Sequence, residues 1–98
     1  MAKIVLAPEV QEDFERIFEF VAARDPGSAV ARIESIVAAI DILRTSPEIG
    51  RPATKGKREL IIGSGTNGFV ALYVYAKEFD TVFILAIRGQ REAGYARD

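Results

Sequence analysis

The first half of the chain carries two apolar stripes with the spacing of α-helices. The first stripe recurs at intervals of four, three and four residues: Val10, Phe14, Ile17 and Val21. Residues at these intervals lie on one face of a helix. Pro8 suits the first helical turn, where its missing N–H group is not needed. The pattern predicts a helix that ends near Arg24.

A second helix follows after a short connection. Its stripe recurs at intervals of four, three, four and three residues: Ala29, Ile33, Ile36, Ile40 and Leu43. Asp25 and Pro26 are typical of a helix start, with Asp as the N-cap and Pro at the first helical position. Pro47 predicts the helix end, because it disfavours helical backbone at the preceding residue. We expect the two helices to pack as an antiparallel hairpin.

The second half of the chain has the composition of β-structure. Three segments are rich in β-branched and aromatic residues, namely residues 59–62, 69–75 and 81–87. Turn-forming segments separate them, which predicts a three-stranded antiparallel meander. Residues 4–6 predict a short strand before the first helix. The pattern therefore indicates an α+β fold in one domain, residues 1–98, with an N-terminal strand, a helical hairpin and a meander.

Both faces of the predicted middle strand are apolar. One face carries Phe69, Ala71, Tyr73 and Tyr75, and the other carries Val70, Leu72 and Val74. A sheet covered by helices on one side only is expected to alternate apolar with polar residues. The second face therefore needs a cover. Either the C-terminal tail, residues 93–98, or a partner protein can supply it, and the sequence leaves both open.

Charge divides the chain into an acidic and a basic half. Residues 1–48 hold five Lys/Arg against nine Asp/Glu, a balance of −4, and residues 49–98 hold eight against five, a balance of +3. A nucleic-acid-binding protein is usually more basic than this overall. We therefore expect no sequence-specific nucleic-acid binding by the chain alone, and an anionic partner would meet the sheet half.

Several kinds of chemistry are excluded by composition. The chain has no histidine and no cysteine, which removes a Ser-His-Asp triad, a Cys nucleophile and the usual transition-metal ligands. We expect no metal and no cofactor. No apolar run approaches the roughly 20 residues that span a bilayer, and no signal peptide is visible. The sequence predicts a cytoplasmic protein without a membrane partner.

The remaining candidate chemistry is a set of basic and phenolic side chains: Arg51, Lys55, Lys57, Arg58, Arg88 and Arg91, with Tyr73, Tyr75 and Tyr95. Cleavage of RNA needs a proton acceptor, cations near the phosphorane and an acid for the leaving oxygen. Lys, Arg and Tyr can fill these roles only if close packing shifts a pKa toward neutrality. The alternative is surface charge with core-facing tyrosines, and a binding role for the arginines suits both interpretations.

In order along the chain, these features resemble the RelE/ParE superfamily of toxins from type II toxin–antitoxin modules. The resemblance covers nearly the whole chain and rests on these stretches: Ala7-Pro8-Glu9 to Asp13-Phe14 and Ile17, Asp25-Pro26 with Ala29, Leu43 with Pro47 and Gly50-Arg51, Arg58-Glu59-Leu60, residues 69–75 and residues 84–91. RelE-like members cut mRNA in the ribosomal A site. ParE-like members poison DNA gyrase and are not enzymes. In both, an antitoxin wraps the toxin through its C-terminal segment, which implies a cover for exposed apolar surface.

Several residues favour the ParE-like branch. The pI near 5.5 is low for the nucleases, which also tend to have an arginine where this chain has Val70. At Arg88 the chain departs from the family pattern, because many members have histidine there. The Pro47 to Arg51 junction and the Arg58-Glu59-Leu60 strand are similar to ParE-like toxins. The resemblance thus implies a gyrase inhibitor, with a ribosome-dependent mRNA endonuclease as the alternative and a member that only binds its antitoxin as a third.

The resemblance also implies site residues. We expect four arginines to contact the target: Arg51, Arg58, Arg88 and Arg91. A nuclease would instead use Arg91, Tyr95, Lys55 and Lys57. The antitoxin is expected to contact apolar residues of the first helix and the middle strand: Phe14, Phe18, Val70, Leu72 and Val74.

Overall fold

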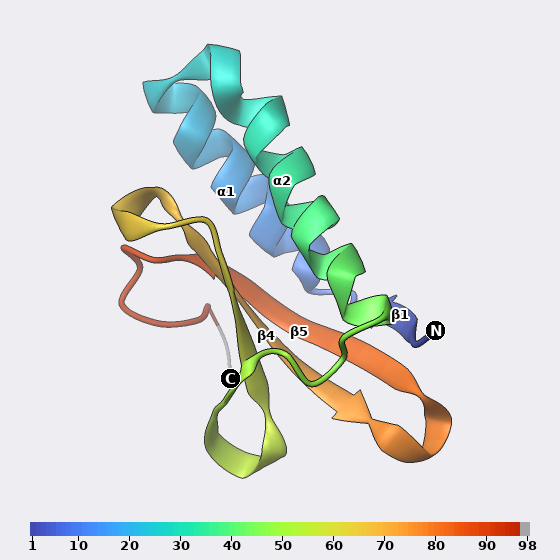
Figure 1. Cartoon of the computed structure of the whole chain (residues 1–98). Coiled ribbons are helices and arrows are strands. Elements are labelled where there is room, and N and C mark those ends of the chain that lie inside the picture. Colours follow the sequence, from blue (N-terminus) through green and yellow to red (C-terminus); the bar gives the residue numbers. More distant parts are fainter. Residues whose placement is uncertain (97–98) are drawn as a thin grey trace.

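The computed structural model describes residues 1–96 and has a helical hairpin packed on one face of a sheet (Figure 1). The helices are α1 (Val10–Arg24) and α2 (Ala29–Asp41). The strands are β1 (Lys3–Leu6), β2 (Arg51–Pro52), β3 (Arg58–Ile62), β4 (Phe69–Ala76) and β5 (Thr81–Gly89). The predicted α+β class, hairpin and three-stranded meander are confirmed. Two residues of the predicted tail, 97 and 98, lie outside the described part.

The sheet is larger and more mixed than the meander alone. Its five strands follow the order β1-β5-β4-β3-β2. β1 runs parallel to β5, pairing Lys3 with Thr81 through Leu6 with Ile84. β2 pairs antiparallel with β3 at the opposite edge. The sequence pattern predicted the N-terminal strand but not its partner, and it treated Arg51 and Pro52 as a junction without a strand.

The connection between the helices differs in detail from the prediction. Pro26 opens a 3-10 turn, Pro26–Ser28, and α2 begins only at Ala29. Asp25 occupies the predicted N-cap position, with Pro26 in the first turn, but within the described residues the Asp25 side chain makes no capping hydrogen bond. The Asp25 carbonyl oxygen instead accepts hydrogen bonds from the N–H and hydroxyl groups of Ser28. The hydrogen bonds at this helix start are therefore accepted by a backbone oxygen and not by the Asp25 side chain.

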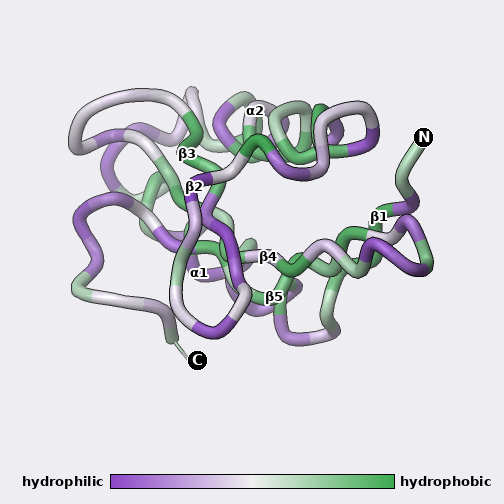
Figure 2. Tube along the Cα trace, turned by 60° about the horizontal axis from the view of Figure 1, so that its bottom comes forward, coloured by the Kyte–Doolittle hydropathy of each residue, from purple (hydrophilic) through white to green (hydrophobic). Residues whose placement is uncertain are grey.

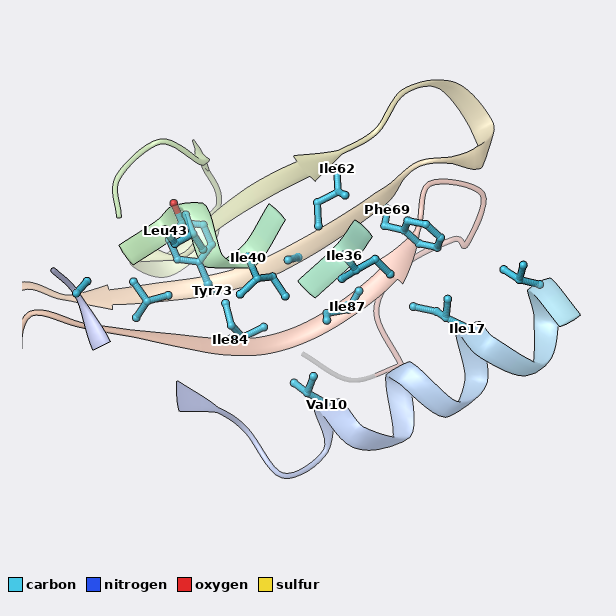
Figure 3. Packing of buried hydrophobic residues seen from close by; sticks show 14 of the residues in the cluster. Val10, Ile17, Ile36, Ile40, Leu43, Ile62, Phe69, Tyr73, Ile84 and Ile87 are labelled. Atoms are coloured by element: carbon cyan, nitrogen blue, oxygen red, sulfur yellow. The ribbon is translucent and has the colours of Figure 1, made fainter. Parts of the chain in front are cut away.

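The core lies between the hairpin and the helix-facing side of the sheet (Figure 3). The helices contribute side chains from the two predicted stripes, including Val10, Ile17, Ile36 and Ile40. The strands contribute inward-facing residues, including Ile62, Phe69, Tyr73, Ile84 and Ile87, with the alternation on β5 interrupted by a register shift opposite Leu72 and Tyr73. Figure 2 shows hydrophobic residues along β4 and β5 in the middle of the molecule and hydrophilic ones in loops around them.

Tyr73 joins the core to the Pro47–Arg51 junction. Its side chain is fully buried, as predicted for a core-facing tyrosine, and its hydroxyl oxygen accepts a 2.9 Å hydrogen bond from the Gly50 N–H group. A Cβ atom on Gly50 would lie 2.6 Å from that oxygen and 2.9 Å from the Glu59 carbonyl oxygen. Gly50 is therefore required because of the space that Tyr73 occupies.

Two charged side chains of α1 form hydrogen bonds with backbone groups at the edge of β5. Asp13 is fully buried, and its Oδ2 accepts a 3.0 Å hydrogen bond from the Ile87 N–H group. Arg16 donates to the Ile87 carbonyl oxygen at 2.9 Å and to Asp13 at 2.8 Å. In the described chain β1 pairs with β5 only as far as Ile84. The helix side chains therefore satisfy backbone groups that no strand reaches.

Candidate partner-binding surfaces

Four side chains gather on the sheet face turned away from the helices. Arg51, Glu59, Arg88 and Tyr95 form what we call the Glu59 cluster. Arg51 Nε donates to Glu59 Oε1 at 3.0 Å, and the Tyr95 hydroxyl donates to Glu59 Oε2 at 2.6 Å. The Arg88 guanidinium lies over the Tyr95 ring, 5.0 Å from its centroid. The cluster brings together two predicted target-contact arginines with one predicted nuclease residue.

The electrostatics of the cluster favour binding over proton transfer. The hydrogen bond from Tyr95, followed by those of Arg51, lowers the pKa of Glu59. Burial and the neighbouring Glu59 carboxylate raise the pKa of Tyr95. At neutral pH, Glu59 therefore stays ionised and Tyr95 stays protonated. An efficient general base or acid needs a pKa near the working pH, and both groups are shifted away from it.

The chain's own tail covers part of this sheet face. Tyr95 reaches Glu59 on β3, and Arg88 donates to the Glu92 carbonyl oxygen at 3.4 Å, so the segment after β5 returns across the sheet (Figure 1). Val70 and Leu72 are buried, although both point away from the helices. Tyr95 of the predicted tail thus lies on the second face, as in the own-tail alternative, while Ile61 and Phe83 on the same face stay exposed.

The other predicted target-contact residues lie apart from the Glu59 cluster. Arg58 alternates with Glu59 along β3 and donates to the carbonyl oxygens of Glu48 and Gly50, at 3.1 and 2.8 Å. It thereby holds the junction before β2. Arg91 is exposed beyond β5 and lines a pocket against α1. Their predicted contacts with a target remain predictions, and the structure places them at separate positions.

The predicted nuclease lysines lie outside the cluster as well. Lys55 is exposed at the turn between β2 and β3, where its φ of 57° is left-handed. Lys57 is half-buried next to β3. Glu59, which organises the cluster, was missed as a site residue by the sequence analysis. Strand alternation predicts that Glu59 and Arg58 lie on opposite faces of the sheet. No feature of the sequence predicts that Tyr95 returns over the sheet to contact Glu59.

The predicted antitoxin contacts divide into two groups. Phe14 and Phe18 line a shallow groove on the outside of the hairpin with Ile33, bordered by Glu15 and Glu19. Phe18 is 41% exposed, so this part of the predicted site is open to a partner. Val70 and Leu72 are buried and Val74 is half-buried. Of the predicted strand contacts, only Val74 is therefore partly open to an antitoxin.

The Tyr95–Glu59 hydrogen bond gives a pH-dependent prediction. Because the pKa of Glu59 is lowered in the folded protein, its stabilisation is present above the pKa of the unfolded chain and is lost as the pH falls through the lowered value. We expect Tyr95→Phe to raise the pKa of Glu59. The ¹³C chemical shift of the Glu59 carboxyl group, recorded in an NMR titration, measures this change. The stability difference from wild type should shrink in acid. Tyr75→Phe removes a hydroxyl bonded to Asp80 and should leave the Glu59 titration unchanged; an equal effect of both substitutions would contradict the prediction.

Solved structures share this fold. The chain is similar to one from the chromosomal ParDE TA system from P. aeruginosa, with a TM-score of 0.77 and 20% identity, covering 91% of this chain and 96% of that chain. It is also similar to one from the intact E. coli RelBE toxin-antitoxin complex, with a TM-score of 0.65 and 16% identity, covering 94% and 99%. The two comparisons show that the chain shares its fold with these structures.

The family follows from a match to a sequence-family model. The model described as the ParE toxin of the type II toxin-antitoxin system parDE matches residues 4–94, so the chain belongs to the ParE toxin family. This confirms the predicted superfamily and its ParE-like branch. No curated protein matches the chain at a significant level. Within residues 1–96, no helix is long and apolar enough to cross a membrane, and no group of three acidic side chains is placed to hold a metal ion.

Proposed function

We propose that this ParE toxin inhibits DNA gyrase and that the Glu59 cluster is part of the surface that contacts it. The proposed action is to trap the covalent enzyme–DNA intermediate of gyrase, so that replication stalls and DNA breaks accumulate. Gyrase supplies the chemistry and the toxin supplies a surface. This activity requires the protein in the cytoplasm, where gyrase works.

The observation that carries the proposal is the fixed charge of the cluster. Two arginines flank one carboxylate, which leaves a net positive charge, and the lowered pKa of Glu59 keeps that balance constant around neutral pH. Arg51 has 58% of its side chain exposed and can contact a partner directly. Arginine suits the capture of carboxylate or phosphate groups. The arrangement supports recognition of an anionic surface by a protein that need not transfer protons.

A cognate antitoxin is the second proposed partner. The groove lined by Phe14, Phe18 and Ile33 is apolar and lies outside the Glu59 cluster. A helix or strand of the antitoxin that laid apolar side chains there would shield this surface from water. Both solved relatives come from toxin–antitoxin systems, which supports a partner of this kind.

The arginine contribution is tested with the double variant Arg51→Gln/Arg88→Gln. We expect the concentration that half-inhibits gyrase supercoiling to rise roughly tenfold or more, because two charge-assisted contacts are lost. Arg24→Gln/Arg44→Gln makes the same charge change on the helical hairpin and should leave inhibition unchanged. Circular dichroism and urea unfolding check that both variants fold. Full inhibition by the folded Arg51→Gln/Arg88→Gln variant would remove these residues from the target surface.

One observation favours a second function, that of an mRNA endonuclease. A carboxylate, two cations and a phenol lie together in the Glu59 cluster, and these groups occur in ribonuclease mechanisms. The shifted pKa values of Glu59 and Tyr95 argue against it. Mapping of transcript ends after induction distinguishes the functions: cuts within codons that disappear in Tyr95→Phe would support the endonuclease.

A further inference from the structure

The pocket that Arg91 lines lies between α1, the first turn of α2 and the turn between β3 and β4. Its volume is about 360 Å³, within the range of small-ligand sites. The floor is apolar and is formed by Ile17, Phe20, Val21 and Phe69. Three arginines stand around it: Arg16, Arg32 and Arg91. Phe20 is 48% exposed, so part of the apolar lining is open to a partner.

The three arginines differ in how their charge is matched. Arg16 pairs with Asp13 and Glu92, at 2.8 and 3.0 Å. Among residues 1–96, no carboxylate lies within ion-pair distance of Arg32 or Arg91. The pocket therefore has an apolar floor and two cations available for an anion.

Arg32 is also incompletely hydrogen-bonded. Its Nη2 donates to the Asn67 carbonyl oxygen at 2.6 Å, and its guanidinium lies over Phe69, 5.4 Å from the ring centroid. Its Nε is buried and has no acceptor in the described chain. A buried donor without an acceptor carries an energetic cost. An acceptor brought by a partner, with a small turn of the guanidinium, would remove that cost.

We infer that this pocket binds a segment of the cognate antitoxin in which a bulky apolar side chain stands next to acidic residues. The inference rests on the proposed antitoxin partnership and adds the chemistry of one contact. The apolar side chain would cover Phe20 and Phe69, and the carboxylates would pair with Arg32 and Arg91.

Charge complementarity distinguishes this pocket from the outer groove. The groove at Phe14 and Phe18 is bordered by Glu15 and Glu19, so it disfavours an acidic segment. The pocket is lined by three arginines and one carboxylate, Glu92, which pairs with Arg16, so its charge is net positive. An antitoxin chain that meets both surfaces would be fixed in register, because exchanging its segments would place like charges together.

The pocket is tested first with short peptides and the full chain. The probe is Ac-Asp-Leu-Phe-Asp-NH2, with Ac-Asn-Leu-Phe-Asn-NH2 as its neutral match. Amide NMR signals of Gly68 and Gly89, both in the pocket wall, report binding. We expect the acidic peptide to bind roughly tenfold more tightly than the neutral one. Equal affinities, or no shift at either glycine, would overturn the inference.

Variants then connect the pocket to the antitoxin. Arg32→Gln is expected to remove the preference for the acidic peptide and to weaken binding of the cognate antitoxin roughly tenfold. Arg91→Gln provides a second, exposed position for the same test. Arg44 lies just beyond the far end of α2, so Arg44→Gln should change neither the affinity for the acidic peptide nor the affinity for the antitoxin. Unchanged antitoxin affinity in both pocket variants would overturn the inference and leave the proposed function standing, whereas a wild-type chain that does not bind the antitoxin would contradict both.

Discussion

Gly50→Ala is expected to lower the free energy of unfolding by about 3 kcal/mol. The added methyl group would sit 2.6 Å from the Tyr73 hydroxyl oxygen, 2.7 Å from its ring and 2.9 Å from a backbone oxygen. Tyr73 is fully buried and cannot move away without disturbing the core. The displacement would also break the hydrogen bond between the Gly50 N–H group and the Tyr73 hydroxyl. Urea unfolding of the purified variant measures the loss.

Gly27→Ala is the matched control for this prediction. A Cβ atom there would meet only the Asp25 side chain, at 3.9 Å, which is ordinary contact. Alanine also restricts the unfolded chain more than glycine does. The control should therefore be neutral or slightly stabilising. If Gly50→Ala were as stable as Gly27→Ala, the close packing of Tyr73 on the junction would be refuted.

Asp13→Ala is the second large effect, also about 3 kcal/mol. The substitution leaves the Ile87 N–H group without its acceptor and removes one partner of Arg16 in a buried setting. Removing one member of such a pair is costly because the remaining groups stay desolvated. Since Asp13 binds the strand that carries Arg88, the loss should also loosen the end of β5. Amide hydrogen exchange at Ile87 would rise with the fall in stability.

Asp41→Ala tests whether burial is the reason for the large stability loss expected of Asp13→Ala. Asp41 and Arg44 form an ion pair with the same i,i+3 spacing as Asp13 and Arg16, but Asp41 has 65% of its side chain exposed and Asp13 has 1%. Exposed pairs contribute about 0–1 kcal/mol. A similar loss in both variants would show that the backbone contacts of Asp13 contribute little.

The fold could be predicted from the sequence where apolar residues recur at the regular spacing of a helix or form the apolar run of a strand. The stripes of α1 and α2 and the runs of β3, β4 and β5 identified those elements. The pairing of β1 with β5 could not be predicted, because strands 70 or more residues apart leave no local signal. The two-residue strand β2 is also too short for a period.

The site was predicted less completely than the fold. Arg51 and Arg88 do come together, but a strand's alternation places Arg58 on the other face. Glu59 was not predicted as a site residue because its role depends on Tyr95, which returns over the sheet from the tail. In the sequence, Gly50 stood out only as part of the Pro47 to Arg51 junction, whereas the structure shows that it makes room for Tyr73. Each difference arises from contacts between residues distant in sequence.

Supercoiling of relaxed plasmid by purified gyrase, with the wild-type chain titrated in, tests the central claim most directly. We expect inhibition with accumulation of cleaved DNA, relieved when the cognate antitoxin is added first. Folded toxin in excess that leaves supercoiling unchanged would contradict gyrase inhibition.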